Sequence, residues 1–203
     1  MAKTDLIFKR GSLIGLLMIL TLTLMLACSG GGNTSGGKAT EVATKAYEAF
    51  RQSDWVTYAS WMHPRALERF ESILRPAFDV MIQVDSAGNV PEEFKWYDST
   101  IKTEEFLNMP PGEFFAFSMS ELTKAVPGLG EALRGSSMEV IGEVAEGDSL
   151  VHAVVRTSAE AMGMGMTEVS VMTSAVSDGE YRLMLSGQIE GLATAVAQGM
   201  RGR

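Results

Sequence analysis

The spacing of hydrophobic positions changes once along the chain, near residue 138. Before this point apolar residues recur every three or four positions, which predicts helices over residues 40–52, 53–63, 64–75, 104–109 and 110–126. Beyond it apolar and polar residues alternate, which predicts four strands. Gly147-Asp148 and Asp178-Gly179 are the hairpin turns that this pattern needs, and a short helix is expected over residues 191–203.

The ends of the expected helices follow from capping residues and prolines. Thr40 and Ser53 are the expected N-caps of the first two helices. Pro76 should interrupt the third helix, and Pro127-Gly128 should stop the helical region ahead of the strands. Residues 80–100 show no clear period, apart from a turn expected at residues 86–89.

Helices followed by an antiparallel meander define an α+β fold. We expect the N-terminal helices to pack on one face of a C-terminal sheet of about four strands. No internal repeat and no linker divides this region, so residues 39–203 are predicted to form a single domain.

The first 27 residues have the pattern of a secretory signal peptide. Lys3, Lys9 and Arg10 precede an uncharged run of 17 residues that ends at Ala27. Such a run is just long enough to span a bilayer as a helix, so an uncleaved membrane anchor is the alternative. Residues 28–38, which are rich in glycine and serine, are predicted to form a flexible tether.

The segment Leu24-Met25-Leu26-Ala27-Cys28 resembles the lipobox of bacterial lipoproteins. Cys28 is the only cysteine of the chain, and it stands where that family carries its lipid. Leu26 departs from the pattern, in which a smaller residue is usual. The resemblance implies cleavage before Cys28 and acylation of this residue. Because Ser29 follows in place of an aspartate, it also implies the outer membrane, facing the periplasm, as the destination.

Charge narrows the range of partners. The net charge is −8, and it becomes −10 once Lys3, Lys9, Arg10 and Asp5 leave with the signal peptide. We expect no nucleic acid as a partner, because phosphate binding needs a concentrated basic surface. Anionic lipid should repel the domain, so only lipid on Cys28 would hold it to a membrane.

Residues 39–67 resemble the opening of an NTF2-like (cystatin-like) domain. The similar motifs are Ala-Tyr-Glu-Ala-Phe, Ser-Asp-Trp and Met-His-Pro. In that family a curved sheet wraps a long helix and encloses a conical pocket, so the resemblance implies a cone of this kind. The long helical region before the strands and the four readable strands depart from the family's pattern.

Three residues could bind a ligand in such a pocket. His152 and Arg156 share one face of a predicted strand, and Arg182 joins them if the register of the sheet allows it. Together they would suit an acidic or polar ligand, or hold a base. The alternative is that they belong to a solvated face of the sheet.

Two further motifs are better explained as structure. Gly147-Asp148-Ser149-Leu150 spells the motif of the GDSL hydrolases, but no Asp-x-x-His follows, and a serine without a positioned base is weakly reactive. Met162, Met164 and Met166 could bind a soft cation such as Cu(I), but no histidine or cysteine lies beside them, and they are expected in a loop. We therefore predict no catalytic residue, no metal and no cofactor.

The sequence alone does not decide between three functions. The first is a lipid-anchored envelope lipoprotein that binds a small ligand or another envelope protein without catalysis. The second is an NTF2-like enzyme that performs acid–base chemistry in a buried pocket, and the third is a structural or assembly subunit of the envelope. A deep pocket lined by His152, Arg156 or Arg182 would favour the first two, whereas an exposed apolar sheet face would favour the third.

Overall fold

The structure is a computed structural model that describes residues 37–82, 89–161 and 164–201. Cys28, the signal peptide and residues 28–36 of the tether lie outside these ranges, as does most of the turn expected at residues 86–89. The described residues belong to one unit of packed elements. Within them no helix combines the length and the apolar character that a membrane span requires.

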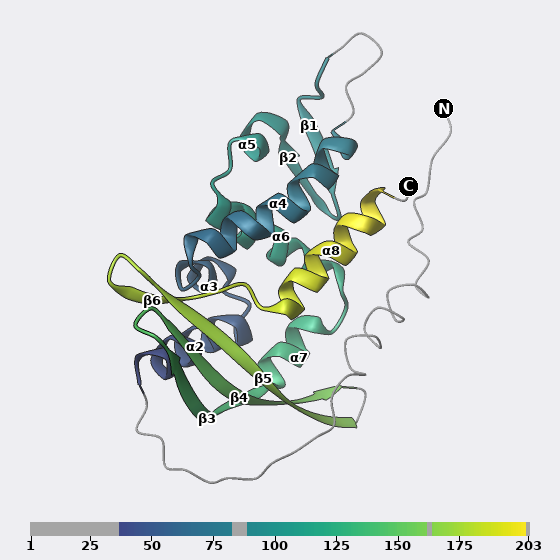
Figure 1. The fold of residues 1–203 in the computed structure, drawn as a ribbon. Coiled ribbons are helices and arrows are strands. Elements are labelled where there is room, and N and C mark those ends of the chain that lie inside the picture. Colours follow the sequence, from purple (N-terminus) through teal and green to yellow (C-terminus); the bar gives the residue numbers. More distant parts are fainter. Residues whose placement is uncertain (1–36, 83–88, 162–163, 202–203) are drawn as a thin grey trace. The chain divides into compact units, whose positions relative to one another are not determined.

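Helices make up the first part of this unit, as the spacing of apolar residues predicts. They are α2 (Lys38–Arg51), α3 (Trp55–Ser60), α4 (Pro64–Met81), α5 (Thr103–Leu107), α6 (Pro111–Ala125) and α7 (Leu129–Gly135), and α8 (Gly187–Arg201) follows the strands (Figure 1). α4 packs against both α6 and α8, and α3 packs against α6.

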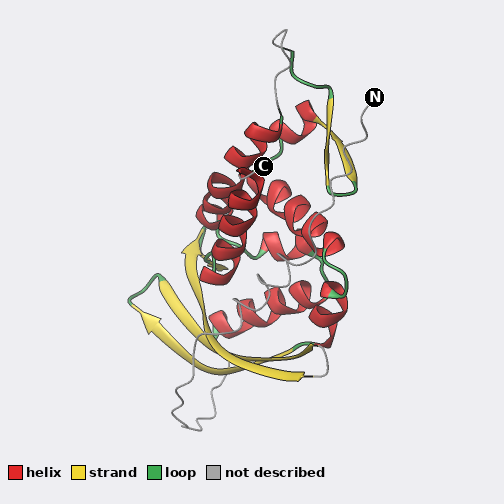
Figure 2. Ribbon diagram, turned by 90° about the vertical axis from the view of Figure 1, so that its right-hand side faces the viewer, coloured by secondary structure: helices red, strands yellow, loops and turns green. Residues whose placement is uncertain are grey.

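The second part supplies an antiparallel meander. Its strands β3 (Ser137–Glu146), β4 (Leu150–Ala161), β5 (Met164–Ser177) and β6 (Glu180–Leu183) pair in chain order. The helices lie on one side of this sheet (Figure 2), and α2 contacts all four strands. The α+β class, with helices covering an antiparallel sheet of four strands, is thus confirmed.

Aromatic side chains form the centre of the helical layer. Fully buried rings come from three helices: Phe70, Phe78, Phe106, Phe114 and Phe115. The ring of Phe78 lies edge-on to Trp96 with centroids 4.4 Å apart, and Phe70 meets Phe115 at 4.8 Å. Burial of each such side chain contributes about 2–3 kcal/mol, so this cluster is a main source of stability.

A small hairpin lies in the region where the sequence shows no clear period. It consists of β1 (Glu93–Trp96) and β2 (Ser99–Lys102), which pair only with each other. Phe94 and Trp96 point into the core, whereas Glu93 and Lys95 are exposed. Because the strand has four residues and only two of them are apolar, the alternation of apolar and polar positions is too short to be recognised in the sequence.

Both expected N-caps are wrong. α2 begins before Thr40 and has Gly37 as its N-cap, because the side chain of Thr40 is bonded to Glu143 on β3. α3 is capped by Asp54, whose Oδ1 accepts the N–H of Thr57 at 3.0 Å. Ser53 has a φ of 56° in the turn between the two helices.

Three other boundaries also differ. Pro76 does not interrupt α4, because Leu74, Ala77 and Phe78 are buried on both sides of it and their packing outweighs one lost hydrogen bond. Pro127-Gly128 ends α6, but the short helix α7 follows directly. α8 begins at Gly187, four residues earlier than expected.

Candidate functional site

The register of the sheet brings His152, Arg156 and Arg182 to its outer face. This face is opposite to Val151, Ala153 and Val155, which alternate with His152 and Arg156 along β4 and are buried against the helices. His152 pairs with Thr173 and Arg182 with Ala175, two residues further along β5, so their side chains share that face.

Each of these three side chains is already engaged by neighbours. His152 Nε2 lies 2.8 Å from Glu146 Oε2, and its Nδ1 lies 3.0 Å from Thr173 Oγ1.

The two arginines are engaged in the same way. Arg156 donates to Glu139 at 2.9 Å, while Arg182 donates to Glu180 at 3.1 Å and to the carbonyl oxygen of Ser60. None of the three predicted site residues lines either of the two cavities described below. Their geometry is that of ion pairs on a solvated face.

The hydrolase motif and the methionine motif fall in ordinary structure. Ser149 is part of the β3–β4 turn, while the ring of His152 is bonded to Glu146 and Thr173. Met164 and Met166 belong to strand β5 and not to a loop; Met162 lies outside the described residues. Within the described ranges, no group of three His, Cys, Asp or Glu side chains is placed to hold a metal ion.

A hollow of about 800 Å³ runs along one side of α6, and we call it the α6 groove. Its floor is a set of residues at helical spacing: Glu113, Ala116, Phe117, Ser120, Glu121 and Lys124. Its walls are the start of α3, strand β2 and residues 105 and 109. A second hollow, between α4, α6 and α8, has a volume of about 10 Å³ and an apolar lining, which leaves no room for an organic ligand.

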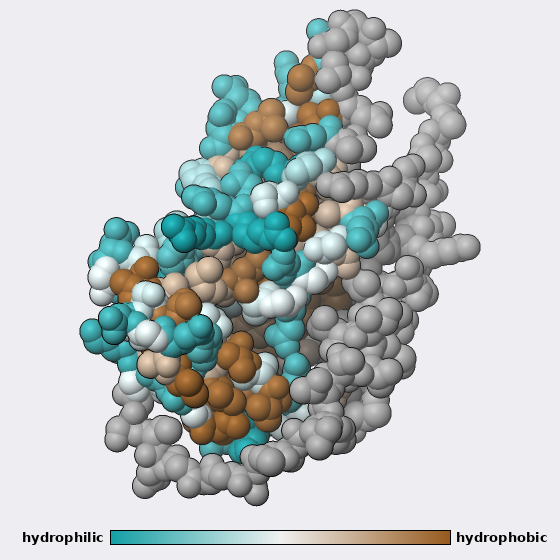
Figure 3. All heavy atoms as spheres, viewed as in Figure 1, coloured by the Kyte–Doolittle hydropathy of each residue, from teal (hydrophilic) through white to brown (hydrophobic). Residues whose placement is uncertain are grey.

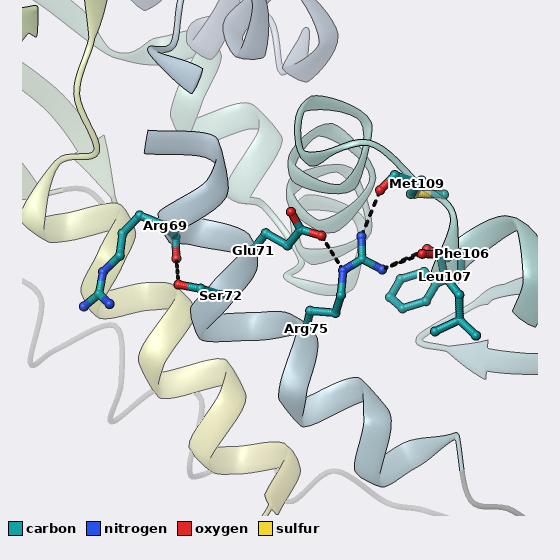
Figure 4. A network of polar contacts seen from close by, with 7 residues as sticks. All are labelled: Arg69, Glu71, Ser72, Arg75, Phe106, Leu107 and Met109. Atoms are coloured by element: carbon teal, nitrogen blue, oxygen red, sulfur yellow. Dashed lines mark hydrogen bonds and ion pairs between the residues drawn. The ribbon is translucent and has the colours of Figure 1, made fainter. Parts of the chain in front are cut away.

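Arg75 of α4 holds the segment that brings Met109 into the wall of the α6 groove. Figure 4 shows the polar contacts of Arg75. Its guanidinium donates to the carbonyl oxygens of Phe106 at 3.0 Å and Met109 at 2.9 Å, and to Glu71 at 2.5 Å. It also lies 4.4 Å from the ring centroid of Phe114. A cation at the last carbonyls of α5 stabilises the end of that helix, so the segment that carries Met109 into the groove is held in place.

Three residues of the α6 groove have a buried polar atom without a hydrogen-bond partner. These atoms are Ser53 Oγ, Trp55 Nε1 and Glu121 Oε2. Only 4% of Trp55 and 2% of Glu121 are exposed. A buried donor or acceptor without a partner costs about 1–3 kcal/mol, and more when it is charged. Such atoms are uncommon, and three of the seven found among the described residues belong to this hollow; the others are on Arg51, Thr103, Ser118 and Ser174.

Glu121 has one partner of its own, Lys124. Glu121 Oε1 lies 2.6 Å from Lys124 Nζ, one helical turn further along α6. The exposures of the two side chains are very unequal, at 2% for Glu121 and 63% for Lys124. The acid is therefore fixed in the protein, while the ammonium that neutralises it stands at the surface.

The lining of the α6 groove is acidic overall. Five carboxylates belong to it, Asp54, Glu93, Glu105, Glu113 and Glu121, against the two ammonium groups of Lys102 and Lys124. Hydrogen bonds from the side chain and the backbone of Thr57 lower the pKa of Asp54, so this carboxylate is ionised at neutral pH. The lining thus carries an excess of negative charge, and its Trp55 has a buried donor without a partner among the described residues.

The sequence contains a signal for this site that its hydrophobic pattern conceals. Phe114, Ser118 and Glu121 stand at positions i, i+4 and i+7 of α6, and all three are buried. A glutamate on the stripe that a helix buries is unusual, whereas a glutamate in a helix is common. A buried glutamate can be told from an exposed one only when the buried face of the helix is known, and this face is known only from the fold.

No protein-family model matches the chain, and no curated protein matches it significantly. Among solved structures, the chain is similar to one described as an NTF-2 like protein of unknown function from Shewanella oneidensis MR-1. The two chains are 9% identical, with a TM-score of 0.40 over 73% of this chain and 93% of that one.

Proposed function

We propose that this protein is a lipid-anchored, non-catalytic module of the bacterial envelope that binds a small polar ligand in the α6 groove. The observation that carries the proposal is the group of unpartnered polar atoms of Ser53, Trp55 and Glu121. A ligand that offered hydrogen bonds to them would recover the free energy that their burial costs. The volume of about 800 Å³ lies within the usual range for small-molecule sites.

Entry of the ligand requires Lys124 to move. The atoms without partners are covered, and the Lys124 side chain, which is 63% exposed, is bonded to Glu121. The lysine side chain is long and exposed, so it can change rotamer, but Glu121 is buried and loses its ion-pair partner when Lys124 moves. A donor of the ligand must therefore replace the ammonium while the ligand enters. The backbone around the groove can stay fixed, with Arg75 holding one wall.

A screen of small polar compounds against the full-length protein in a neutral detergent tests this proposal. Trp55→Phe removes the indole N–H and keeps an apolar ring, so it should weaken binding of any true groove ligand by about tenfold. Trp61→Phe is the matched control, because Trp61 does not line the groove. Heteronuclear NMR of the three indole N–H signals would report both binding and its place. If no compound shows dependence on Trp55, the groove is not a binding site.

The membrane anchor in this proposal is the lipid on Cys28. Its support is the basic start, the uncharged run and the lipobox-like segment that ends at the chain's only cysteine. The described fold starts at residue 37, so a short tether would join it to the lipid. Labelling with a fatty acid, together with the mass of the mature amino terminus, tests the anchor. Cys28→Ser should abolish the label and leave the signal peptide uncleaved, whereas a wild-type chain that starts at Met1 would contradict it.

A second candidate function is an assembly subunit, which the outer face of the sheet favours. Val144, Val169 and Val171 are each more than half exposed on that face, and hydrophobic residues gather over β3, β4 and β5 (Figure 3). The flanking pairs, Arg156 with Glu139 among them, carry both signs of charge, which suits a second copy related by a twofold axis. Sedimentation of the full-length protein tests self-assembly through this face: a dimer that Val169→Lys and Val171→Lys dissociate would support it, and a monomer would exclude it.

A further inference from the structure

The charges of the α6 groove restrict the ligand that it can hold. Its five carboxylates outnumber its two ammonium groups, and only Glu121 among them is paired with Lys124. An anion that entered would meet this excess of negative charge. A cation would be attracted, and its charge would compensate that of the lining.

Glu121 also shows which kind of cation it accepts. One of its oxygens holds the primary ammonium of Lys124 at 2.6 Å, and the other has no partner. A carboxylate oxygen accepts hydrogen bonds and cannot donate them, so the free Oε2 needs an N–H or O–H donor. A quaternary ammonium lacks N–H and would leave this oxygen unsatisfied. The Lys124 ammonium thus supplies to Glu121 the same chemical group that an amine ligand would supply.

The remaining free atoms require an acceptor. Trp55 Nε1 carries a hydrogen and can only donate, while Ser53 Oγ can do either. A ligand carboxylate would accept these bonds, but the acidic lining disfavours it. A hydroxyl or an amide carbonyl supplies an acceptor without a charge. Phe117, Ala116 and Ile101 give the groove an apolar surface against which a short hydrocarbon segment can pack.

Building on the function proposed above, we infer that the ligand of the α6 groove is a small primary amine that also carries a neutral hydrogen-bond acceptor, such as an amino alcohol. Its ammonium binds Glu121 Oε2 beside Lys124, which holds Oε1 and whose positive charge opposes a second cation, and its hydroxyl accepts a bond from Trp55 Nε1. Glu121 is thus the residue that selects for positive charge, and Trp55 selects for the acceptor.

A series of unbranched amino alcohols with two to six carbons is the probe for this inference. The matched compounds are diols, hydroxy acids and trimethylated amino alcohols of the same lengths, which lack the charge, reverse it or lack the N–H. Titration calorimetry on the full-length protein in a neutral detergent measures the affinities. We expect at least one amino alcohol to bind about tenfold or more tightly than each of its three matched compounds.

Three variants connect the affinity to the proposed contacts. Glu121→Gln keeps the shape of the side chain and removes its charge, so amine binding should fall by about tenfold or more. Glu131→Gln is the matched control, because Glu131 is exposed and does not line the groove, and it should change binding by less than about threefold. Lys124→Met removes the opposing positive charge and should tighten amine binding by about threefold or more. If Glu121 had only a structural role and did not bind the amine, Lys124→Met would not tighten amine binding.

The possible outcomes separate this inference from the proposed function. If a diol or a hydroxy acid binds as tightly as the amino alcohol, and Trp55→Phe weakens it, the groove binds ligands but the inferred class is wrong. The same conclusion follows if the amino alcohols fail while another compound binds in a Trp55-dependent way. If Trp55→Phe weakens the binding of neither the amino alcohols nor any other compound, both the proposed function and the inferred ligand class are wrong. Should Glu121→Gln unfold, the effect of Lys124→Met decides the matter alone.

Discussion

Thr40 and Glu143 are joined by two hydrogen bonds although they lie 103 residues apart in the sequence. Glu143 Oε2 accepts the backbone N–H of Thr40 at 3.0 Å and its hydroxyl at 2.8 Å. α2 has no side-chain cap of its own, because its N-cap is Gly37. The carboxylate of Glu143 satisfies one of the free N–H groups at the start of the helix, and its charge suits the positive end of the helix dipole. β3 thus caps the helix that packs upon it.

Replacement of Glu143 should therefore destabilise the domain more than replacement of an ordinary surface acid. Glu143→Ala removes an N-terminal cap and leaves the N–H of Thr40 without this partner, which should lower the free energy of unfolding by about 1–2 kcal/mol. Glu139→Ala is the control, because Glu139 forms an exposed ion pair with Arg156 and should contribute less than about 1 kcal/mol. Urea unfolding followed by circular dichroism measures both, and equal effects would contradict the capping role.

The contact between Thr40 and Glu143 also illustrates what the sequence could and could not predict. The helices and the four-stranded meander follow from local spacing, and the β5–β6 turn follows from Asp178-Gly179, whose φ values are 52° and 81°. Thr40 looks like an N-cap because its true partner comes from a distant strand. No local rule identifies such a partner, since it depends on how α2 lies on the sheet.

The α6 groove was not predictable for the same reason. Trp55, Glu121 and Ser53 are ordinary residues of helices and turns until the packing of α3 on α6 places them around one hollow. His152, Arg156 and Arg182 were predicted as ligand-binding residues because they could share one face of the sheet, and the structure shows a glutamate beside each one. Sequence patterns locate the face on which a residue lies, but its partners depend on tertiary contacts.

A second prediction concerns Arg75, whose side chain is mostly buried. Arg75→Met keeps much of the packing against Phe114 but removes the donors to the carbonyl oxygens of Phe106 and Met109. The loss of these bonds should lower the free energy of unfolding by about 2–3 kcal/mol. Arg69→Met is the control on the same helix. Arg69 is 60% exposed and pairs with Glu190, so this substitution should lower the free energy of unfolding by less than about 1 kcal/mol. Thermal unfolding of the two variants would distinguish them, and a milder effect for Arg75 would contradict its role.

A third prediction concerns pH, through Tyr58. Burial raises the pKa of Tyr58 from 10.0 to about 12, because the charged phenolate is disfavoured in the core. In the unfolded chain the same phenol ionises near its ordinary pKa of about 10, so above that pH the unfolded state holds fewer protons than the folded state. Stability is unaffected by Tyr58 below about pH 10 and falls between about pH 10 and pH 12, by up to about 2–3 kcal/mol.

Tyr58→Phe cannot ionise, so the difference in unfolding free energy between this variant and the wild type should change over the same interval. Urea unfolding at pH 8, 10 and 11 measures that difference, and ultraviolet absorbance follows the ionisation directly. A constant difference across the three pH values would mean that Tyr58 ionises as it does in water.

The last prediction contrasts two glycines that both have open space beside them. No atom would lie within 4 Å of a Cβ added at Gly179 or at Gly191. Gly179 has a φ of 81° in the β5–β6 turn, where an L side chain strains the backbone, so Gly179→Ala should destabilise the domain by about 1–2 kcal/mol. Gly191 lies inside α8, where alanine restricts the unfolded chain without strain, so Gly191→Ala should stabilise it by about 0.5–1 kcal/mol. Because neither substitution meets a neighbour, the opposite signs would come from the backbone alone. Melting temperatures of the two variants test this, and a shift in the same direction for both would contradict the backbone explanation.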